Sequence, residues 1–368
     1  MTRTAPPFRA DHVGSLLRPA SLKEARARRE RGEISSADLR AAEDAAIEHI
    51  IARQAEVGLR SATDGEFRRA MWHFDFLEHL DGVESFRSDH GIAFQGGIET
   101  QPKGLRVTGK PGFSTHPMVE HFRFLRDRTR ATPKMTIPSP SVLHFRGGRR
   151  AVSPDVYPEM EEFYGDLAAA YRGAVRAFAD AGCRYLQLDE VNLAYLCDPE
   201  QRRILRARAD DPDQIPGIYA AMINTAIGGR PADMIVTMHL CRGNFRSSWI
   251  AEGGYEPVAE LLFNQIGVDG YFMEFDTERA GGFEPLRFVP KNKTVVLGLV
   301  TSKTGALESV AELERRIGEA AKYIDPEQLC LSPQCGFAST EEGNVLSEEE
   351  QWAKLARIVE AARKVWGE

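Results

Sequence analysis

A histidine and a cysteine, two residues apart, close an apolar stretch in the second half of the chain. Residues 234–240 read MIVTMHL, and Cys241 follows, before the turn RGN. A short apolar run that ends in a glycine turn predicts a buried strand. Residues i and i+2 of a strand point to the same face, so the His239 imidazole and the Cys241 thiol are expected side by side. Both groups are zinc ligands, although a buried cysteine is often only a small apolar residue.

Other reactive side chains follow the ends of other predicted strands. They are Asp64 and Glu66, Asp189 and Glu190, Glu274 and Asp276, Lys303, and Cys335. Structural residues would not gather in this way at one end of the strands. The best tetrahedral set for a metal is His239, Cys241, Glu274 and Cys335, and its two thiolates favour Zn2+ over magnesium or calcium. For Cys335, which lies in the loop SPQCGF, the alternative is a buried loop cysteine.

A carboxylate beside two thiolates is the most exchangeable of the four ligands. An incoming thiol that replaced Glu274 would bind as a thiolate and stay nucleophilic at neutral pH, which points to alkylation of a thiol. Asp189 and Glu66 would then hold the ammonium group of an amino-acid thiol, unless they form salt bridges with Arg68, Arg69 or Lys303. Ser15, after a glycine turn, is expected either to bind a substrate carboxylate or to cap a helix. Trp72, Trp249 and Phe337 are either stacking surfaces for a flat donor or core residues.

Strands and helices that would position these residues alternate along the chain. Helical periodicity runs over residues 36–57, 160–178, 257–266 and 347–365, and the last of these opens with the capping-box pair Ser347 and Glu350. Eight strands are predicted. One covers residues 8–13, one follows Gly58 and runs into residues 63–66, and the others lie at residues 134–137, 185–190, 234–241, 271–274, 295–299 and 329–332. Eight βα units predict an α/β fold of the (β/α)8 TIM-barrel type, with an open doubly wound sheet as the alternative.

Residues 81–116 interrupt this alternation. They are rich in glycine, polar and β-favouring residues and show no helical periodicity. We therefore expect an inserted β-hairpin or flap there. No Gly/Ser-rich linker divides the chain, so residues 1–368 are expected to form one barrel domain.

Composition excludes several classes of protein. The 368 residues are 42% hydrophobic and 27% charged, with a formal net charge of −7 and no basic block interleaved with aromatic residues, so no nucleic-acid partner is expected. No apolar run reaches the length of a membrane span, and the N-terminus lacks a secretory signal, which indicates a cytoplasmic protein that does not enter membranes. Cysteines stay reduced in that compartment, and Cys183, Cys197 and Cys330 are expected to be structural. The sequence leaves open whether copies of the chain associate into a homo-oligomer.

Six motifs together resemble the catalytic barrel of the cobalamin-independent methionine synthases. They are HVGSLLRP (12–19), DGEFRR (64–69), LQLDE (186–190), MHLCRGN (238–244), FMEFDTERAG (272–281) and SPQCGF (332–337). The resemblance implies that His239, Cys241, Glu274 and Cys335 bind zinc. It also implies that Ser15, Glu66 and Asp189 contact homocysteine, with His12 of the first motif as a further substrate-binding residue. The implied reaction is methyl transfer from 5-methyltetrahydrofolate to homocysteine, which forms methionine.

Two departures from the family pattern bear on the donor. Nothing in the chain corresponds to the second, N-terminal barrel that helps to bind the folate tail. The family's Asp-x-His after the seventh strand reads Thr301-Ser302-Lys303, so Lys303 is expected to be the general acid or to bind an anionic donor, and the reaction is assigned to Lys303, Asp189 and Glu66. Alternatives are another thiol and electrophile, such as coenzyme M and an epoxide, a non-catalytic zinc scaffold, and a metal-free decarboxylase-like barrel.

Overall fold

Six parallel strands form the central sheet of the computed structural model, which describes residues 3–367. The order in the sheet is β12-β11-β10-β9-β8-β7, so strands that follow one another in the chain are neighbours in the sheet. The six strands are β7 (Met135–Pro138), β8 (Tyr185–Glu190), β9 (Ile235–Leu240), β10 (Gly270–Glu274), β11 (Thr294–Val300) and β12 (Leu329–Pro333). Almost every residue of these strands is buried, as expected for a parallel sheet covered by helices. The predicted α/β class and parallel sheet are confirmed.

The first two predicted strands are much shorter than the sequence pattern suggests. β1 (Ser61–Ala62) pairs in parallel with β6 (Thr132–Pro133), which leads into β7 one residue later. The segment predicted at residues 8–13 contributes one parallel bridge, from Ala10 to Leu331 of β12. Apart from the strands of residues 81–116, the backbone ladders described over residues 3–367 join six strands in one sheet and β1 with β6 in a separate pair, rather than eight strands in a ring.

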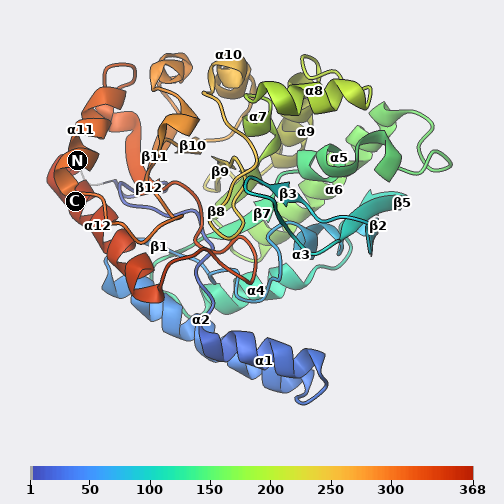
Figure 1. Ribbon diagram of the computed structural model, residues 1–368, viewed down its shortest axis with the longest axis horizontal. Coiled ribbons are helices and arrows are strands. Elements are labelled where there is room, and N and C mark those ends of the chain that lie inside the picture. The colour runs from blue at the N-terminus through green and yellow to red at the C-terminus, as the bar shows by residue number, and fades with distance from the viewer. Residues whose placement is uncertain (1–2, 368) are drawn as a thin grey trace.

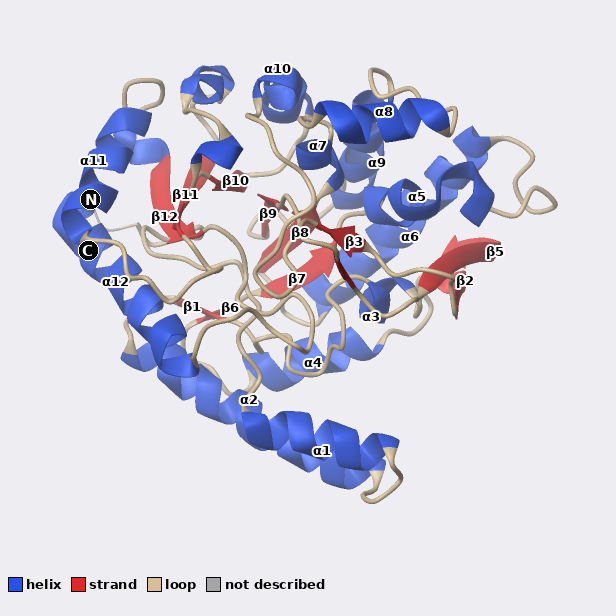
Figure 2. Cartoon of the chain, viewed as in Figure 1, coloured by secondary structure: helices blue, strands red, loops and turns tan. Residues whose placement is uncertain are grey.

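Helices surround the sheet, as Figures 1 and 2 show. The longer ones are α1 (Ala20–Glu30), α2 (Ser36–Glu56), α4 (Pro117–Arg126), α6 (Met160–Asp180), α8 (Pro199–Ala207), α9 (Ile215–Ile227), α10 (Glu256–Gln265), α11 (Val310–Ala320) and α12 (Glu348–Trp366). Shorter ones are α3 (Phe74–Leu77), α5 (Ser141–Gly147), α7 (Asn192–Tyr195) and the 3-10 turns Gly148–Ala151, Glu278–Ala280, Glu284–Phe288 and Pro326–Gln328. The four predicted helices appear as α2, α6, α10 and α12.

Helix ends follow the sequence signals at most, though not all, of the predicted positions. The capping box at the start of α12 is formed by Ser347 and Glu350. Gly58 and Gly182, which follow α2 and α6, have φ of 92° and 93° and supply the predicted left-handed turns. The same prediction is wrong for Gly267, because α10 ends in an extended Ile266 and needs no left-handed residue.

The insertion at residues 81–116, called the flap from here on, is built from two antiparallel pairs. β2 (Asp81–Phe86) pairs with β5 (Gly104–Gly112), and the small hairpin β3 (Ala93–Phe94) and β4 (Ile98–Glu99) lies between them in the chain. The predicted inserted hairpin is confirmed. In Figure 1, β2 and β5 lie at the right margin, whereas β3 lies over the centre of the molecule, near the labels of β7, β8 and β9.

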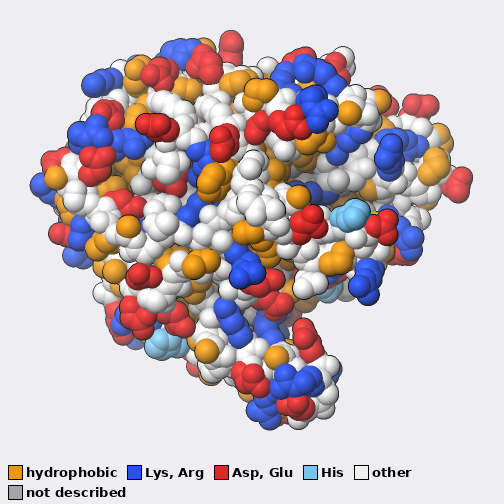
Figure 3. Space-filling model, viewed as in Figure 1, with side chains coloured by type: hydrophobic (Ala, Val, Ile, Leu, Met, Phe, Trp, Pro, Cys, Tyr) orange, Lys and Arg blue, Asp and Glu red, His pale blue; other side chains and the backbone are white. Residues whose placement is uncertain are grey.

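The distribution of charged side chains and cysteines agrees with what the composition predicts. Figure 3 shows Lys and Arg side chains interspersed with Asp and Glu over the displayed face. All five cysteines are buried. Within residues 3–367, no helix combines the length and apolar character needed to cross a membrane.

Candidate metal and thiol site

His239 and Cys241 lie together at the carboxyl end of β9. The backbone stays extended past the last strand residue, and the Cys241 N–H donates to the carbonyl of Glu190 in β8 at 3.1 Å. Parallel pairing with β8 places His239 next to Asp189. The strand therefore directs the imidazole and the thiol to the same end of the sheet, as the His-x-Cys spacing predicts.

Cys335 completes a cluster with these two residues. Its Sγ lies 3.5 Å from the Cys241 Sγ, and one ligand atom from each of His239, Cys241 and Cys335 lies within 4.8 Å of the others. Cys335 comes from the loop after β12, almost a hundred residues further along the chain. All three residues are buried. We call this group the His–Cys–Cys cluster; the structure thus brings together three of the four predicted metal ligands.

The donor atoms of the cluster have few hydrogen-bond partners within the described chain. Neither ring nitrogen of His239 has a hydrogen-bond partner among the described residues. Burial lowers the pKa of His239, but the nearby Cys241 sulfur, Asp189 and Glu274 outweigh it, and the pKa is raised. The contact with Cys335, together with burial, raises the pKa of Cys241 well above its ordinary value. Buried polar groups normally have partners, and one nitrogen with two sulfurs is a donor set that fits zinc.

Glu274, the predicted fourth ligand, lies close to the cluster but outside the group of three. Its Oε1 accepts hydrogen bonds from Gln334 Nε2 at 3.2 Å and the Arg242 N–H at 3.4 Å. Its Oε2 forms ion pairs with Arg279 at 3.5 Å and Arg242 at 3.8 Å. Burial raises the pKa of Glu274, but the cations Arg279, Arg242 and Lys303 outweigh it and the pKa is lowered. Glu274 is therefore a buried, ionised carboxylate at the edge of the cluster.

Glu66 and Asp189 line the cavity into which the cluster opens. Glu66 has a left-handed backbone with φ of 62°, which is uncommon outside glycine and typical of functional positions. Its Oε1 accepts a hydrogen bond from Thr136 Oγ1 at 3.0 Å, and Oε2 has no hydrogen-bond partner among the described residues. Of the salt bridges considered as an alternative, Glu66 forms one, with Arg69 at 3.6 Å.

The Asp189 carboxyl is held by one neighbour. Gln187 Nε2 donates to its Oδ1 at 2.7 Å. Burial raises the pKa of Asp189 to about 7, with the Glu66 charge acting in the same direction and His239 against it. Two carboxyl groups that line the same buried cavity favour the binding of a cationic group there.

Ser15 also lines this cavity. Its Oγ accepts the Ala338 N–H at 3.3 Å, and it caps no helix, because α1 begins at Ala20 after Pro19. A Cβ on Gly336 would lie 1.9 Å from Ser15 Oγ, so the residue after Cys335 must be glycine for the two segments to meet. His12 does not line the cavity: it is buried elsewhere, and burial lowers its pKa to about 4.

The Lys303 ammonium is held by the loop that follows Cys241. Its Nζ donates to Asn244 Oδ1 at 3.1 Å and to the carbonyls of Gly243 and Ser248 at 3.5 Å, and it does not line the cavity. Asn244 in turn donates through Nδ2 to the Gly336 carbonyl at 2.8 Å. Lys303 therefore connects the loop after Cys241 to the loop that carries Cys335.

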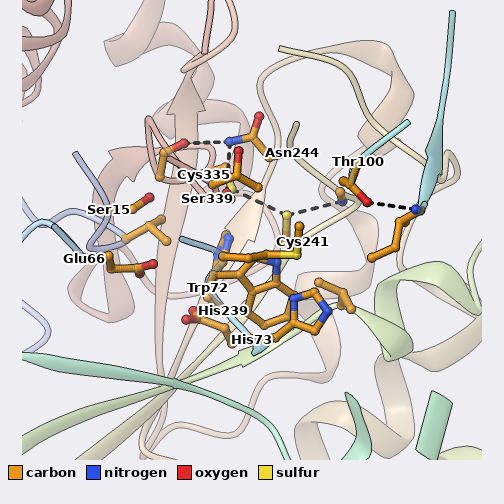
Figure 4. A pocket seen from close by; sticks show the side chains of 18 of the residues that line it. Ser15, Glu66, Trp72, His73, Thr100, His239, Cys241, Asn244, Cys335 and Ser339 are labelled. Atoms are coloured by element: carbon orange, nitrogen blue, oxygen red, sulfur yellow. Dashed lines mark hydrogen bonds between the residues drawn. The ribbon is translucent and has the colours of Figure 1, made fainter. Parts of the chain in front are cut away.

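The flap covers the cavity, which encloses about 580 Å³ of space, part of it open to solvent. Ile92, Phe94 and Thr100 of the flap are among the lining residues. The flap tip is held by two hydrogen bonds, from the Gln95 N–H to the Trp249 carbonyl at 2.8 Å and from Ser248 Oγ to the Gln95 carbonyl at 2.6 Å. Figure 4 shows Ser15 and Glu66 on the left of the cavity, with His239, Trp72 and His73 grouped below Cys241.

Several lining residues were not expected from the sequence. His73 is fully buried, and neither of its ring nitrogens has a hydrogen-bond partner within the described chain. Arg146, Tyr195 and the three flap residues also line the cavity. Trp72 was considered as a stacking surface and does line it, whereas Trp249 and Phe337 do not. The only available signal for His73 was its position directly after Trp72.

Comparison with known proteins gives one consistent result. Residues 130–364 match the family model described as the catalytic domain of cobalamin-independent synthase. The chain is 50% identical to the uncharacterized protein YxjH of Bacillus subtilis (strain 168) over 98% of this chain and 95% of that one. It is 26% identical to a methionine synthase of Pyrococcus abyssi, over 96% and 91% of the two chains.

Two solved structures are similar to this chain. A putative vitamin-B12 independent methionine synthase from Listeria monocytogenes is 42% identical over the whole of both chains, with a TM-score of 0.80. A B12-independent methionine synthase from Shewanella sp. W3-18-1, solved in complex with selenomethionine, has a TM-score of 0.72 over 96% of both chains at 19% identity, which shows a shared fold.

Proposed function

This chain belongs to the cobalamin-independent methionine synthase family, a family of methyltransferases, and from that membership we propose that it transfers a methyl group from 5-methyltetrahydrofolate to the thiol of homocysteine. The observation that supports this most directly is the His–Cys–Cys cluster. It opens into the same cavity as two buried carboxylates and a serine, so groups suited to a thiol, an ammonium and a carboxylate surround one space.

We assign zinc to the cluster, with His239, Cys241 and Cys335 as permanent ligands and Glu274 as the exchangeable fourth. The unpartnered imidazole nitrogens and the sulfurs 3.5 Å apart fit that ion. When bound, zinc supplies the positive charge that keeps a substrate thiol deprotonated and nucleophilic at neutral pH. Arg242 and Arg279 form ion pairs with Glu274 and hold it as a carboxylate beside the cluster.

The remaining polar groups orient the amino acid. Glu66 and Asp189 bind its ammonium group by charge-assisted hydrogen bonds, for which Glu66 Oε2 has a free acceptor site. Ser15 binds the substrate carboxylate through its hydroxyl. The flap limits the access of water to the thiolate, because the hydrogen bonds of Gln95 hold its tip over the cavity. Orientation of this kind converts a bimolecular reaction into one with a high effective concentration.

We also infer that the strands close into a (β/α)8 barrel, with the segment around Ala10 between β12 and β1. The bridge from Ala10 to Leu331 and the pairing of β1 with β6 lie at the two edges of the six-stranded sheet. Ser61 Oγ donates to Asp11 Oδ1 at 3.0 Å, so side chains join the two edges where the backbone ladder is missing.

The test is a metal analysis combined with a panel of thiols and donors. Purified protein is expected to hold about one zinc ion per chain and to form methionine from homocysteine and 5-methyltetrahydrofolate. Chelation should abolish turnover, and added zinc should restore it. Zinc-replete protein that is inactive with the folate but alkylates coenzyme M with an epoxide would replace this proposal by the alternative within the family. Active protein without zinc would overturn the metal assignment.

Lys303→Met is expected to lower kcat about tenfold and to leave the shape of the pH profile unchanged, as befits a positioning residue. The ammonium holds Asn244 and two carbonyls of the loop after Cys241. Lys303→Arg should restore most of the lost rate, since it keeps a cationic donor. Loss of one limb of the kcat profile in Lys303→Met would show instead that the residue is a general acid.

A further inference from the structure

Three segments that are far apart in the sequence meet beside the His–Cys–Cys cluster. They are residues 14–18, which contain Ser15, residues 64–72, which contain Glu66, and residues 335–341, which begin with Cys335. Each segment contributes residues to the lining of the cavity, and Figure 4 shows Ser15, Glu66 and Cys335 around it. Backbone hydrogen bonds join the segments, from the N–H of Leu16 to the carbonyl of Gly65 at 3.1 Å, from Phe337 to Ser15 at 3.0 Å, and from Trp72 to Ser339 at 2.9 Å. We call this meeting point the junction.

The Arg18 side chain lies in the junction and is only 2% exposed. Its guanidinium group donates to four backbone carbonyls, through Nη1 to Ala338 at 2.6 Å and Thr340 at 3.2 Å, and through Nη2 to Glu66 at 2.8 Å and Arg69 at 3.0 Å. One nitrogen therefore holds the loop after Cys335, and the other holds the turn that contains Glu66. Arg18 does not itself line the cavity.

Both the charge and the shape of Arg18 constrain the two loops. Burial lowers the pKa of Arg18 to about 10, which leaves the guanidinium group charged at neutral pH. Hydrogen bonds from a charged donor are about twice as strong as those between neutral groups, so they restrict the four carbonyls more than backbone pairing alone would. The guanidinium group is planar, and the directions of its N–H bonds are fixed relative to one another. A rigid group therefore sets the distance between the loop after Cys335 and the turn that contains Glu66.

Glu66 is the residue that depends most on this constraint. Its φ of 62° lies in the left-handed region, which is unfavourable for a residue that carries a side chain. The bond from Arg18 to the Glu66 carbonyl, and the bond from the Glu66 N–H to Asp64 Oδ1 at 2.9 Å, hold the residue from both sides. Without the guanidinium group, we expect the backbone of Glu66 to relax and its carboxylate to leave the cavity that it shares with Asp189.

We propose that Arg18 is a positioning residue for the amino-acid substrate. Because it holds the Glu66 carbonyl and the loop after Cys335 in one geometry, it fixes the place of the ammonium-binding carboxylate relative to the cluster that binds the thiol. The inference rests on the proposed function, which assigns the ammonium group of homocysteine to Glu66 and Asp189 and its sulfur to the cluster. A substrate that is bound at both ends requires a fixed distance between the two binding groups, whereas a substrate without the ammonium group does not.

The experiment compares homocysteine with 4-mercaptobutyrate, which lacks the amino group. Arg18→Met is expected to raise the KM for homocysteine about thirtyfold, to change kcat by less than about threefold, and to leave the zinc content and the KM for 4-mercaptobutyrate unchanged. The double variant Arg18→Met, Glu66→Gln should have nearly the same KM as Glu66→Gln alone, because the position of the carboxylate no longer matters once its charge is removed. A purely structural role of Arg18 would instead impair both substrates equally and would add to the effect of Glu66→Gln.

Arg9→Met is the matched control. Arg9 is equally buried and donates to the carbonyls of Pro326, Glu327 and Leu329, at the start of β12 and outside the cavity. Arg9→Met should lower the temperature of thermal unfolding, as Arg18→Met should, but it should leave both KM values unchanged. A KM for homocysteine that rose equally in Arg9→Met protein would show that the loss of any buried arginine has this effect, and would overturn the assignment to Arg18.

Arg18→Lys tests the inference even if Arg18→Met does not fold. It keeps the positive charge, but one ammonium group cannot bond to four carbonyls of two loops in the same geometry, so the KM for homocysteine should still rise about tenfold. A wild-type KM in folded Arg18→Lys protein would overturn the inference, as would equal losses with both substrates in Arg18→Met, and methyl transfer would stand in either case. Failure of the wild-type protein to use homocysteine at all would overturn the proposed function and the inference with it.

Discussion

Cys335→Ser is expected to lower zinc content well below one ion per chain and to reduce kcat/KM for homocysteine by about a thousandfold or more. The Cys335 sulfur lies 3.5 Å from that of Cys241, and with His239 it completes the only group of three metal-ligating side chains found within residues 3–367. A serine hydroxyl is a poor zinc ligand at neutral pH, because it does not deprotonate as a thiol does. Metal analysis and methionine formation would be measured on the same preparation.

The control for this variant is Cys197→Ser. Cys197 is also buried, but its thiol lies outside the cluster and donates to the Leu193 carbonyl at 3.6 Å, a bond that a hydroxyl can make. This protein should keep its zinc and most of its activity. Circular dichroism would establish that both variants fold. Full zinc content and full activity in folded Cys335→Ser protein would refute the assignment of Cys335 as a zinc ligand.

Asp189→Asn is expected to raise the KM for homocysteine about a hundredfold, with a smaller change in kcat and none in zinc content. The carboxyl is buried beside Glu66 and accepts one hydrogen bond, from Gln187, so a substrate ammonium would be its main cationic partner. An asparagine keeps the shape but removes the charge. The expected loss corresponds to about 3 kcal/mol, a typical cost for one partner of a buried charged pair.

A homocysteine analogue without the amino group, 4-mercaptobutyrate, distinguishes the loss of ammonium binding from a general loss of activity caused by the substitution. The wild-type protein should use it poorly, and Asp189→Asn should impair it little further, because the interaction removed by mutation is already absent. Asp233→Asn, which changes an exposed carboxylate paired with Arg184, is the control and should behave as wild type. If Asp189→Asn impaired the analogue as severely as homocysteine, the carboxylate would not be an ammonium-binding group.

The sequence predicted those parts of the fold that depend on local patterns. The apolar runs of β7 to β12 and the periodicity of α2, α6, α10 and α12 were recognisable, because each element buries a face that its own residues define. The first two strands were overestimated for a physical reason. Around Asp11 and Ser61 the contact is made by side chains, including the Asp11–Tyr185 and Asp11–Ser61 hydrogen bonds, so backbone pairing there is short.

Within the site, strand alternation was enough to bring His239 and Cys241 to one end of β9, whereas Glu66 lies beyond the short β1 with a left-handed backbone. Strand alternation could not predict the orientation of side chains that depends on the packing of loops far away in the sequence. Lys303 points to Asn244 because the loop of residues 243–248 folds over it, and the position of His12 on the far side of its segment depends on how residues 8–13 lie against β12. His73 and Arg146 become cavity residues only when the flap and α5 are packed in place, which no short-range pattern encodes.

The bonds that hold the flap tip have a consequence for how this region can vary. Both use the backbone of Gln95, which gives its N–H to Trp249 and its carbonyl to Ser248. Exchange of the glutamine for another side chain therefore leaves both bonds intact. Insertion or removal of one residue between β3 and β4 would instead turn the wrong peptide group toward the partner loop. The number of residues between β3 and β4 is therefore constrained, whereas the identity of the side chain at position 95 is not.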